Sequence, residues 1–337
     1  MGGTDTGRRA RVCRSLVLLA CSVAAGCGSD GDRTEQTTTR PATTSPATTS
    51  PATASTITGI TALDPVRVLT PHDGFSTPTF LSIDDDAGLV YVVDADNGRI
   101  VAITLDGTTS APLDNGGVPF DFDVHGPLGS VDVATDGSVY VAESAQRRMI
   151  HLAVDGTVLD TIRVPQELGR LLSASEDRTN NRTFAVDDNG ATVFVFDNAT
   201  GDLITTIGGK GSEPGQLYDT GSVEVLDDGT FWIADAGNRR AQHLTADGDV
   251  ILAIGPFEKN EPGDATYPND VAVDADGRIW LADFRGGGVL AYAPDGTPIG
   301  HFAIDELRRP SSLAFDADGL LYVTDWATAQ VHVFRVS

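Results

Sequence analysis

The amino-acid sequence predicts an all-β protein, a β-propeller of six blades, from two observations. Short apolar runs rich in Val, Ile, Trp and Tyr alternate with Asp-Gly and Gly-Gly turns, as in DADGRIWLADFRGGGVLAYAPDG at residues 274–296. An acidic residue ends the second run of each repeat and recurs every 42 to 49 residues. A period of this size, divided into four short strands, is typical of propeller blades. The six acids are Asp94, Glu143, Asp187, Asp235, Asp283 and Asp325.

The innermost strand of each blade is expected to follow a Pro or Gly and to precede a tight turn, often Asp-Gly. Five segments fit this description: PTFLSID (78–84), GSVDVA (129–134), GSVEVL (221–226), PNDVAVD (268–274) and PSSLAFD (310–316). In the third blade, residues 169–182 lack the clean pattern of an inner strand, although the rest of that repeat is regular. We assign it as a blade all the same.

The last repeat stops at Ser337 after its third strand. A spare strand, ALDPVRVLT at residues 62–70, precedes the first blade without a blade of its own. If it pairs beside VHVFRVS, the ring closes and no edge strand is left open to aggregation. We therefore predict an N-terminal strand that completes the last blade.

The N-terminus predicts export and lipid anchoring. Residues 1–26 combine a basic segment with a short apolar run, as in a signal peptide, and VAAGC resembles the lipobox of bacterial lipoproteins. That resemblance implies lipidation of Cys27, with Cys21 as a competing position, and a location on the outer face of the cytoplasmic membrane. Residues 27–57 are rich in Thr, Pro and Ala and predict a disordered tether. The propeller is assigned to residues 58–337.

Charge and cysteine content exclude several classes of partner and site. The chain carries 48 acidic residues against 23 Lys and Arg, a net charge of −25. Such a surface repels phosphate backbones, so we expect no nucleic-acid binding, and membrane contact only through the lipid. All three cysteines precede residue 28, which excludes a disulfide framework or a cysteine zinc site from the propeller.

Two family resemblances bear on function. Residues 206–255 are similar to an NHL repeat, through GKGSEPGQ, an inner strand, Asp-Gly and WIADAGNR. NHL propellers include lyases, sensor domains and binding modules. Residues 267–296 are also similar to the SMP-30/gluconolactonase family, which holds a divalent metal with Glu, Asn and Asp ligands. Only Asn269, with Asp270 beside it, matches that ligand set. Blade one has STPTF and blade four DTGS at the other two ligand positions.

The candidate site is the channel mouth that the inner strands surround. By the repeat register, Phe80, Ser130, Ser222, Asp270 and Ser312 occupy equivalent positions. Two residues further on most blades carry a small residue, whereas Asp132 and Glu224 are acids, which burial makes costly. His125 is expected near the same opening, and Asn269 beside it. The six acids at the ends of the second strands are assigned to capping turns.

These observations leave two functional hypotheses open. The first is an envelope-anchored, monomeric binding module, a sensor or scaffold, whose ligand is a protein, a glycan or a small molecule on one propeller face. The alternative is a metal-dependent lyase or lactonase, with Ca²⁺ or Zn²⁺, using Asp132, Glu224, Asn269 and Asp270 at the channel mouth. The sequence favours the first, and thus inclines away from an enzyme.

Overall fold

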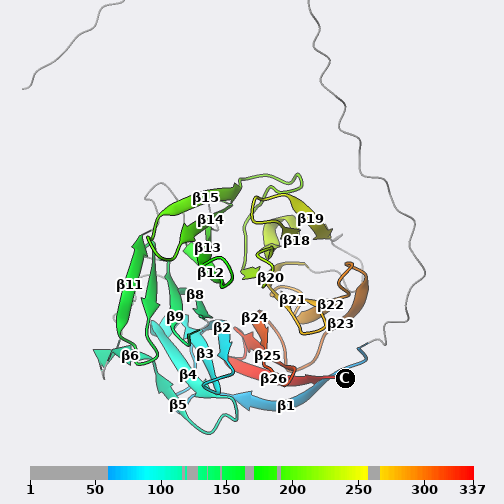
Figure 1. Cartoon of the computed structure of the whole chain (residues 1–337). Coiled ribbons are helices and arrows are strands. Elements are labelled where there is room, and N and C mark those ends of the chain that lie inside the picture. Colours follow the sequence, from blue (N-terminus) through cyan, green and yellow to red (C-terminus); the bar gives the residue numbers. More distant parts are fainter. Residues whose placement is uncertain are drawn as a thin grey trace, which may run out of the picture. The chain divides into compact units, whose positions relative to one another are not determined.

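The computed structural model describes residues 60–115, 118–119, 128–134, 136–144, 146–163, 171–187, 191–256 and 266–337. The predicted signal peptide, Cys27 and the tether, together with His125, lie outside the described residues. Six four-stranded antiparallel sheets are arranged as blades around a central channel, as predicted (Figure 1). No helix of the described part is long and apolar enough to span a membrane.

The strands follow one another from the channel outwards in blades one to five. Blade one contains β2 (Pro78–Asp84), β3 (Leu89–Asp94), β4 (Arg99–Thr104) and β5 (Ser110–Pro112). Blade two contains β8 (Leu128–Val133), β9 (Val139–Glu143), β10 (Arg148–Leu152) and β11 (Val158–Arg163). Blade three contains β12 (Leu171–Asp177), β13 (Arg182–Asp187), β14 (Thr192–Asp197) and β15 (Leu203–Gly208).

Blade four contains β16 (Val223–Val225), β17 (Phe231–Asp235), β18 (Arg240–Leu244) and β19 (Val250–Ile254). Blade five contains β20 (Pro268–Val273), β21 (Ile279–Asp283), β22 (Gly288–Tyr292) and β23 (Pro298–Phe302). Blade six contains β24 (Pro310–Phe315), β25 (Leu320–Asp325), β26 (Gln330–Val336) and β1 (Leu63–Leu69). Two-residue strands β6 (Asp114–Asn115) and β7 (Val118–Pro119), and two 3₁₀ turns, η1 (Ala95–Asn97) and η2 (Ala236–Asn238), complete the described elements.

The N-terminal strand closes the ring as predicted. Strand β1 pairs antiparallel with β26, from Leu63 opposite Val336 to Leu69 opposite Val331. In Figure 1 the two strands lie side by side as the outermost pair of the last blade. The outer edge of β26 is thereby covered by chain that precedes the first blade.

Blade three is complete, although residues 169–182 lack the expected pattern. The inner strand β12 lies within that segment and pairs with β13 along its length. Its sequence, LLSASED, places Ser173 and Ser175 where a typical buried strand would carry apolar side chains. Both serines face the channel, where hydroxyl groups find backbone partners, and this is why the strand does not look apolar in sequence.

The core lies between neighbouring blades. Trp280 and Ala282 of β21, for example, pack in one cluster with Leu313 and Leu321 of the next blade. Strand β21 is buried along its whole length, since it has a neighbouring blade on each face. A strand covered on both faces needs apolar side chains at successive positions, and this explains runs such as IWLA.

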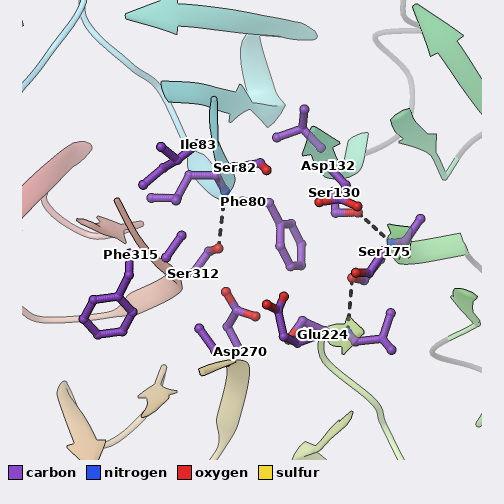
Figure 2. Close-up of a pocket in the computed structure, with 18 of the residues that line it drawn as sticks. Phe80, Ser82, Ile83, Ser130, Asp132, Ser175, Glu224, Asp270, Ser312 and Phe315 are labelled. Carbon is purple, nitrogen blue, oxygen red and sulfur yellow. Dashed lines mark hydrogen bonds between the residues drawn. The ribbon is translucent and has the colours of Figure 1, made fainter. Parts of the chain in front are cut away.

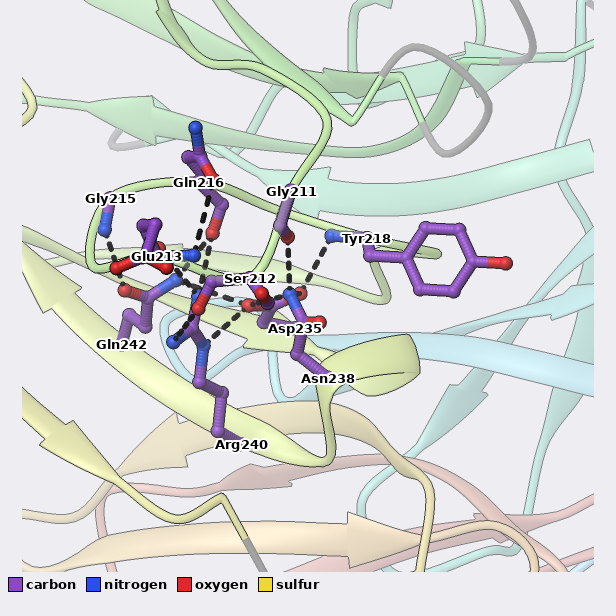
Figure 3. A network of polar contacts seen from close by, with 10 residues as sticks. All are labelled: Gly211, Ser212, Glu213, Gly215, Gln216, Tyr218, Asp235, Asn238, Arg240 and Gln242. Atoms are coloured by element: carbon purple, nitrogen blue, oxygen red, sulfur yellow. Dashed lines mark hydrogen bonds and ion pairs between the residues drawn. The ribbon is translucent and has the colours of Figure 1, made fainter.

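The acids that end the second strands bind neighbouring backbone in more than one way. Asp325 caps its own turn, as the sequence predicts, by accepting the N–H groups of Ala327 at 2.9 Å and Thr328 at 2.8 Å, whereas Asp235 makes no such bond to its own turn. Asp235 is fully buried and accepts the backbone N–H of Tyr218 at 2.8 Å and the Arg240 Nε at 2.7 Å (Figure 3). Arg240 in turn donates to the carbonyl oxygens of Ser212, Glu213 and Gln216. The pair therefore holds the connection that leads into blade four in place.

Candidate functional site

The inner strands bring six equivalent residues together around the channel. In five blades the residue lies two positions after the first strand pair, and in blade four it directly precedes that pair. We call the set the first ring: Phe80, Ser130, Ser173, Ser222, Asp270 and Ser312. All six are buried and line one cavity of about 260 Å³. Figure 2 shows the side chains of Phe80, Ser130, Asp270 and Ser312, which lie around one space between the surrounding strands.

The polar members of the first ring connect each blade to the next. Ser130 Oγ accepts the backbone N–H of Ala174 at 2.8 Å, and Asp270 Oδ2 accepts that of Leu313 at 2.8 Å. Three more serines make the same bond at 3.1 to 3.3 Å: Ser173 to Val223, Ser222 to Val271 and Ser312 to Leu81. Sequence reasoning placed these residues at an open mouth, whereas their burial and bonds make them the wall of the channel.

Two residues further along each strand lies a second ring: Ser82, Asp132, Ser175, Glu224, Ala272 and Ala314. Asp132 Oδ2 accepts the backbone N–H of Glu176 at 2.8 Å, again across to the next blade. Ser82 and Ser175 make the corresponding bonds at 3.1 and 3.2 Å. The carboxyl group of Glu224 makes no hydrogen bond to any described residue, and Glu224 lines the cavity.

Three carboxyl groups therefore share the cavity, and their surroundings raise each pKa. Burial raises the pKa of Asp132 and of Asp270 to about 6. Burial, followed by repulsion from Asp132 and Asp270, raises the pKa of Glu224 to about 8. At neutral pH Glu224 holds a proton while the two aspartates are largely ionised, and groups divided in this way can act as an acid and a base.

Arg178 is the only cationic residue among the described residues that line this cavity. Its Nη2 donates to the carbonyl oxygen of Val133 at 2.9 Å, and its charge lowers the pKa of both Asp132 and Glu224. It stands on the turn between β12 and β13, where most blades have an Asp-Gly turn. The irregular part of blade three thus supplies a cation to the site.

The acids reach solvent at the end of the channel formed by the turns between first and second strands. A second cavity, of about 420 Å³, is lined by Asp132 and Glu224 and by turn residues such as Asp227 and Asp274. The sequence predicts the mouth at the opposite end, where the inner strands begin, and connections at that end such as residues 120–127 and 257–265 lie outside the described residues. Asn269, predicted at that mouth, does not line either cavity; its Nδ2 donates to the Ser311 carbonyl oxygen at 2.6 Å.

The donor groups do not fit the divalent metal that the lactonase resemblance implies. In the described residues, no three His, Cys, Asp or Glu side chains lie close enough to hold one ion. The oxygens of Asp270 accept the N–H groups of Val271 and Leu313, and the Asn269 amide bonds to another blade. No step of the chemistry proposed below passes through a metal.

Sequence reasoning missed Ser173, Ser175 and Arg178. A signal for the two serines was present: counting back 13 or 14 residues from the acid that ends strand two reaches the first ring in every blade. Applied to Asp187, the count gives Ser173. Nothing in the sequence marked Arg178, because only the folded turn brings it to the channel.

Comparisons with known proteins agree with this architecture. Residues 227–327 match the SMP-30/Gluconolactonase/LRE-like region family. A pentonolactonase of Haloferax volcanii is 25% identical over 247 residues, which cover 71% of this chain and 78% of the relative. An L-arabinolactonase of Azospirillum brasilense is 35% identical over 77 residues, 23% of this chain and 25% of the relative.

Among solved structures, a streptogramin B lyase superposes with a TM-score of 0.59 at 13% identity. The match covers 80% of this chain and 97% of the lyase, and at this identity it shows the fold alone. The resemblance to NHL repeats stays a prediction. The chain is therefore a six-bladed β-propeller, and its residues 227–327 are similar to the SMP-30/Gluconolactonase/LRE-like region family.

Proposed function

We propose that this propeller is a hydrolase that opens a small lactone within the channel. The observation that carries the proposal is a pair of carboxyl groups, Asp132 and Glu224, that face one cavity with pKa values on either side of neutrality. Both curated relatives bear the names of lactonases, which supports this chemistry over the binding-module hypothesis. The pentonolactone ring of those names is the substrate class that we propose to test first.

In this mechanism Asp132 is the general base and Glu224 the general acid. Asp132 accepts a proton from a water molecule, whose oxygen forms a bond to the carbonyl carbon of the lactone. The bond from that carbon to the ring oxygen then breaks, and the departing oxygen takes the proton of Glu224. Water and lactone together become one hydroxy acid, and exchange with solvent returns both carboxyl groups to their starting forms.

Asp270 is assigned a different role because its oxygens are already occupied. It accepts two backbone N–H groups, and the hydroxyl groups of Ser222 and Ser312 lower its pKa by hydrogen bonding. Its negative charge also raises the pKa of Glu224, which keeps that acid protonated at neutral pH. Asp270 thus serves the reaction through Glu224, as a positioning residue.

The proposal is tested by assaying release of acid from pentonolactones by the full-length protein. Glu224→Gln and Asp132→Asn should each lower kcat by about 10²- to 10⁴-fold, the usual contribution of a general acid or base. Asp318→Asn, in an exposed turn of blade six, is the matched control and should be neutral. A wild-type protein with no lactonase activity, or variants as active as wild type, would refute the proposal.

The pH profile offers a sharper test. Activity requires Asp132 ionised and Glu224 protonated, so kcat/KM should form a bell with limbs near pH 6 and pH 8. Removing the nearby positive charge in Arg178→Ala should move both limbs to higher pH, since Arg178 lowers both pKa values. Arg178→Lys keeps the charge and should restore the profile. Limbs that stay in place in Arg178→Ala would contradict the assignment.

We also propose that the enzyme works outside the cytoplasmic membrane, held by a lipid on Cys27 and the tether of residues 27–57. The motif VAAGC and the polar segment that follows it support this location. Labelling cells with a fatty acid should mark the wild-type protein and not Cys27→Ala. If Cys21→Ala removes the label instead, the anchor is on Cys21.

A further inference from the structure

Phe80 breaks the pattern of the first ring. In the five other blades this position carries a hydroxyl or carboxyl group that accepts an N–H from the following blade. By the same register Phe80 faces the N–H of Val131, and an aromatic ring cannot accept it as those oxygens do. Blade one therefore lacks the hydrogen bond that the first-ring residue of every other blade accepts from the following blade. Such departures from a repeat are expected where function requires them.

The ring of Phe80 occupies the space that the other residues surround. Figure 2 shows it pointing between the inner strands, with the carboxyl groups of Asp270 and Glu224 beside it. The side chain is 6% exposed and also packs with Val93 and Val131 of the core between blades one and two. It is thus held by neighbours that fix its position in the channel.

Among the described residues, the lining of the cavity lies on one side of Phe80. Its described lining begins at the first ring and continues through the second ring to Arg178 and Phe315. Thr79 and Ser311, one residue before the first ring, do not line it. The carboxyl groups that carry the proposed chemistry are therefore reached from the side of the turns, past Arg178.

We propose that Phe80 closes the channel at the first ring and thereby determines the size of ligand that the site accepts. This inference rests on the proposed function, since it assigns the specificity of the same site. A ligand enters from the turn side, meets Asp132 and Glu224, and packs its far end against the aromatic ring. A lactone with a long substituent opposite the reacting ester finds no room beyond it.

The specificity test compares lactones of increasing substituent length with wild type, Phe80→Leu and Phe80→Ala in the full-length chain. Phe80→Ala should raise kcat/KM for the bulkier lactones relative to pentonolactone by about tenfold or more, mainly through KM. Phe194→Ala is the matched control, since this buried aromatic of blade three does not line the cavity and should leave the preference unchanged. An unchanged preference in both Phe80 variants, with the fold retained, would overturn the inference.

A second measurement needs no activity and separates this inference from the proposed function. In the full chain with Cys13, Cys21 and Cys27 changed to Ser, a cysteine replaces Ser130 of the first ring or Ala314 of the second. Phe80→Ala should accelerate labelling of Ser130→Cys by a bulky maleimide several-fold and leave Ala314→Cys unchanged. If no lactone is hydrolysed, the proposed function fails and this labelling still decides the role of Phe80. If Ser130→Cys were labelled at the same rate with Phe80 and with Phe80→Ala, the inference that Phe80 closes the channel would be refuted.

Discussion

The carboxylate of Asp270 in blade five accepts the backbone N–H of Leu313 in blade six at 2.8 Å. Four serines make the same bond at the equivalent position of their blades. The repeat therefore needs a hydrogen-bond acceptor at this position, which a serine hydroxyl also supplies. The negative charge of Asp270 is an additional feature. Burial and the charge of Asp132 raise the pKa of Glu224, and the charge of Asp270 adds to this rise.

The two roles of Asp270 can be separated by substitution. Asp270→Ser keeps an acceptor for the Leu313 N–H, whereas Asp270→Ala leaves that buried donor unpaired. The alanine variant should be less stable than the serine variant by about 1–3 kcal/mol in urea denaturation at pH 7. Both variants should lower the pKa of Glu224, because both remove the neighbouring charge. Equal stability of the two variants would show that the bond between blades contributes nothing.

Glu224 should make the protein less stable as the pH rises. Its pKa is about 8 in the folded protein and about 4.3 in an unfolded chain, so the folded state binds more protons between these values. The free energy of unfolding contributed by this group is complete below pH 4 and falls by about 1.4 kcal/mol per pH unit up to pH 8. Glu224→Gln should flatten this fall in the free energy of unfolding, most clearly between pH 7 and pH 8, where Asp132 and Asp270 are largely ionised.

The control for this measurement is Glu213→Gln, since Glu213 is exposed in the connection that leads into blade four. Its curve of unfolding free energy against pH should run parallel to that of wild type. A Glu224→Gln curve that also ran parallel to wild type would mean that the carboxyl group is better solvated than its surroundings suggest.

The Asp235–Arg240 pair predicts a strong coupling between two buried charges. Asp235→Asn leaves the Arg240 guanidinium without its carboxylate and should cost about 3–5 kcal/mol. Replacing both residues, as Asp235→Asn with Arg240→Met, removes the stranded charge and should recover part of this loss. A double-mutant cycle from denaturation measures the coupling. If the single and double variants were equally destabilised, the pair would matter only for the loop that Arg240 holds.

Repetition explains what could be predicted from sequence. Six acids at regular spacing, such as Asp283 and Asp325, fix the blade count, and the spare strand at residues 62–70 fixes the closure. Asp132 and Glu224 could be recognised in the sequence because most other blades carry a small residue at the equivalent position. The burial of the Phe80 ring among the inner strands was not recognisable, since the repeat register does not show where a side chain points. A sequence pattern gives the position of a residue on a strand and leaves its direction along the channel unknown.

Closure by β1 can be tested by removing residues 62–70. The deletion strips β26 of its partner and exposes a strand edge from Gln330 to Val336 together with apolar side chains such as Phe334. We expect the variant to aggregate or to lose its cooperative thermal transition, because an open strand edge pairs with other chains. Replacing Val68, an exposed residue of β1, with Thr is the matched control and should leave the melting temperature within a few degrees of wild type. A soluble, cooperatively melting deletion would mean that the remaining three strands of blade six close the ring without β1.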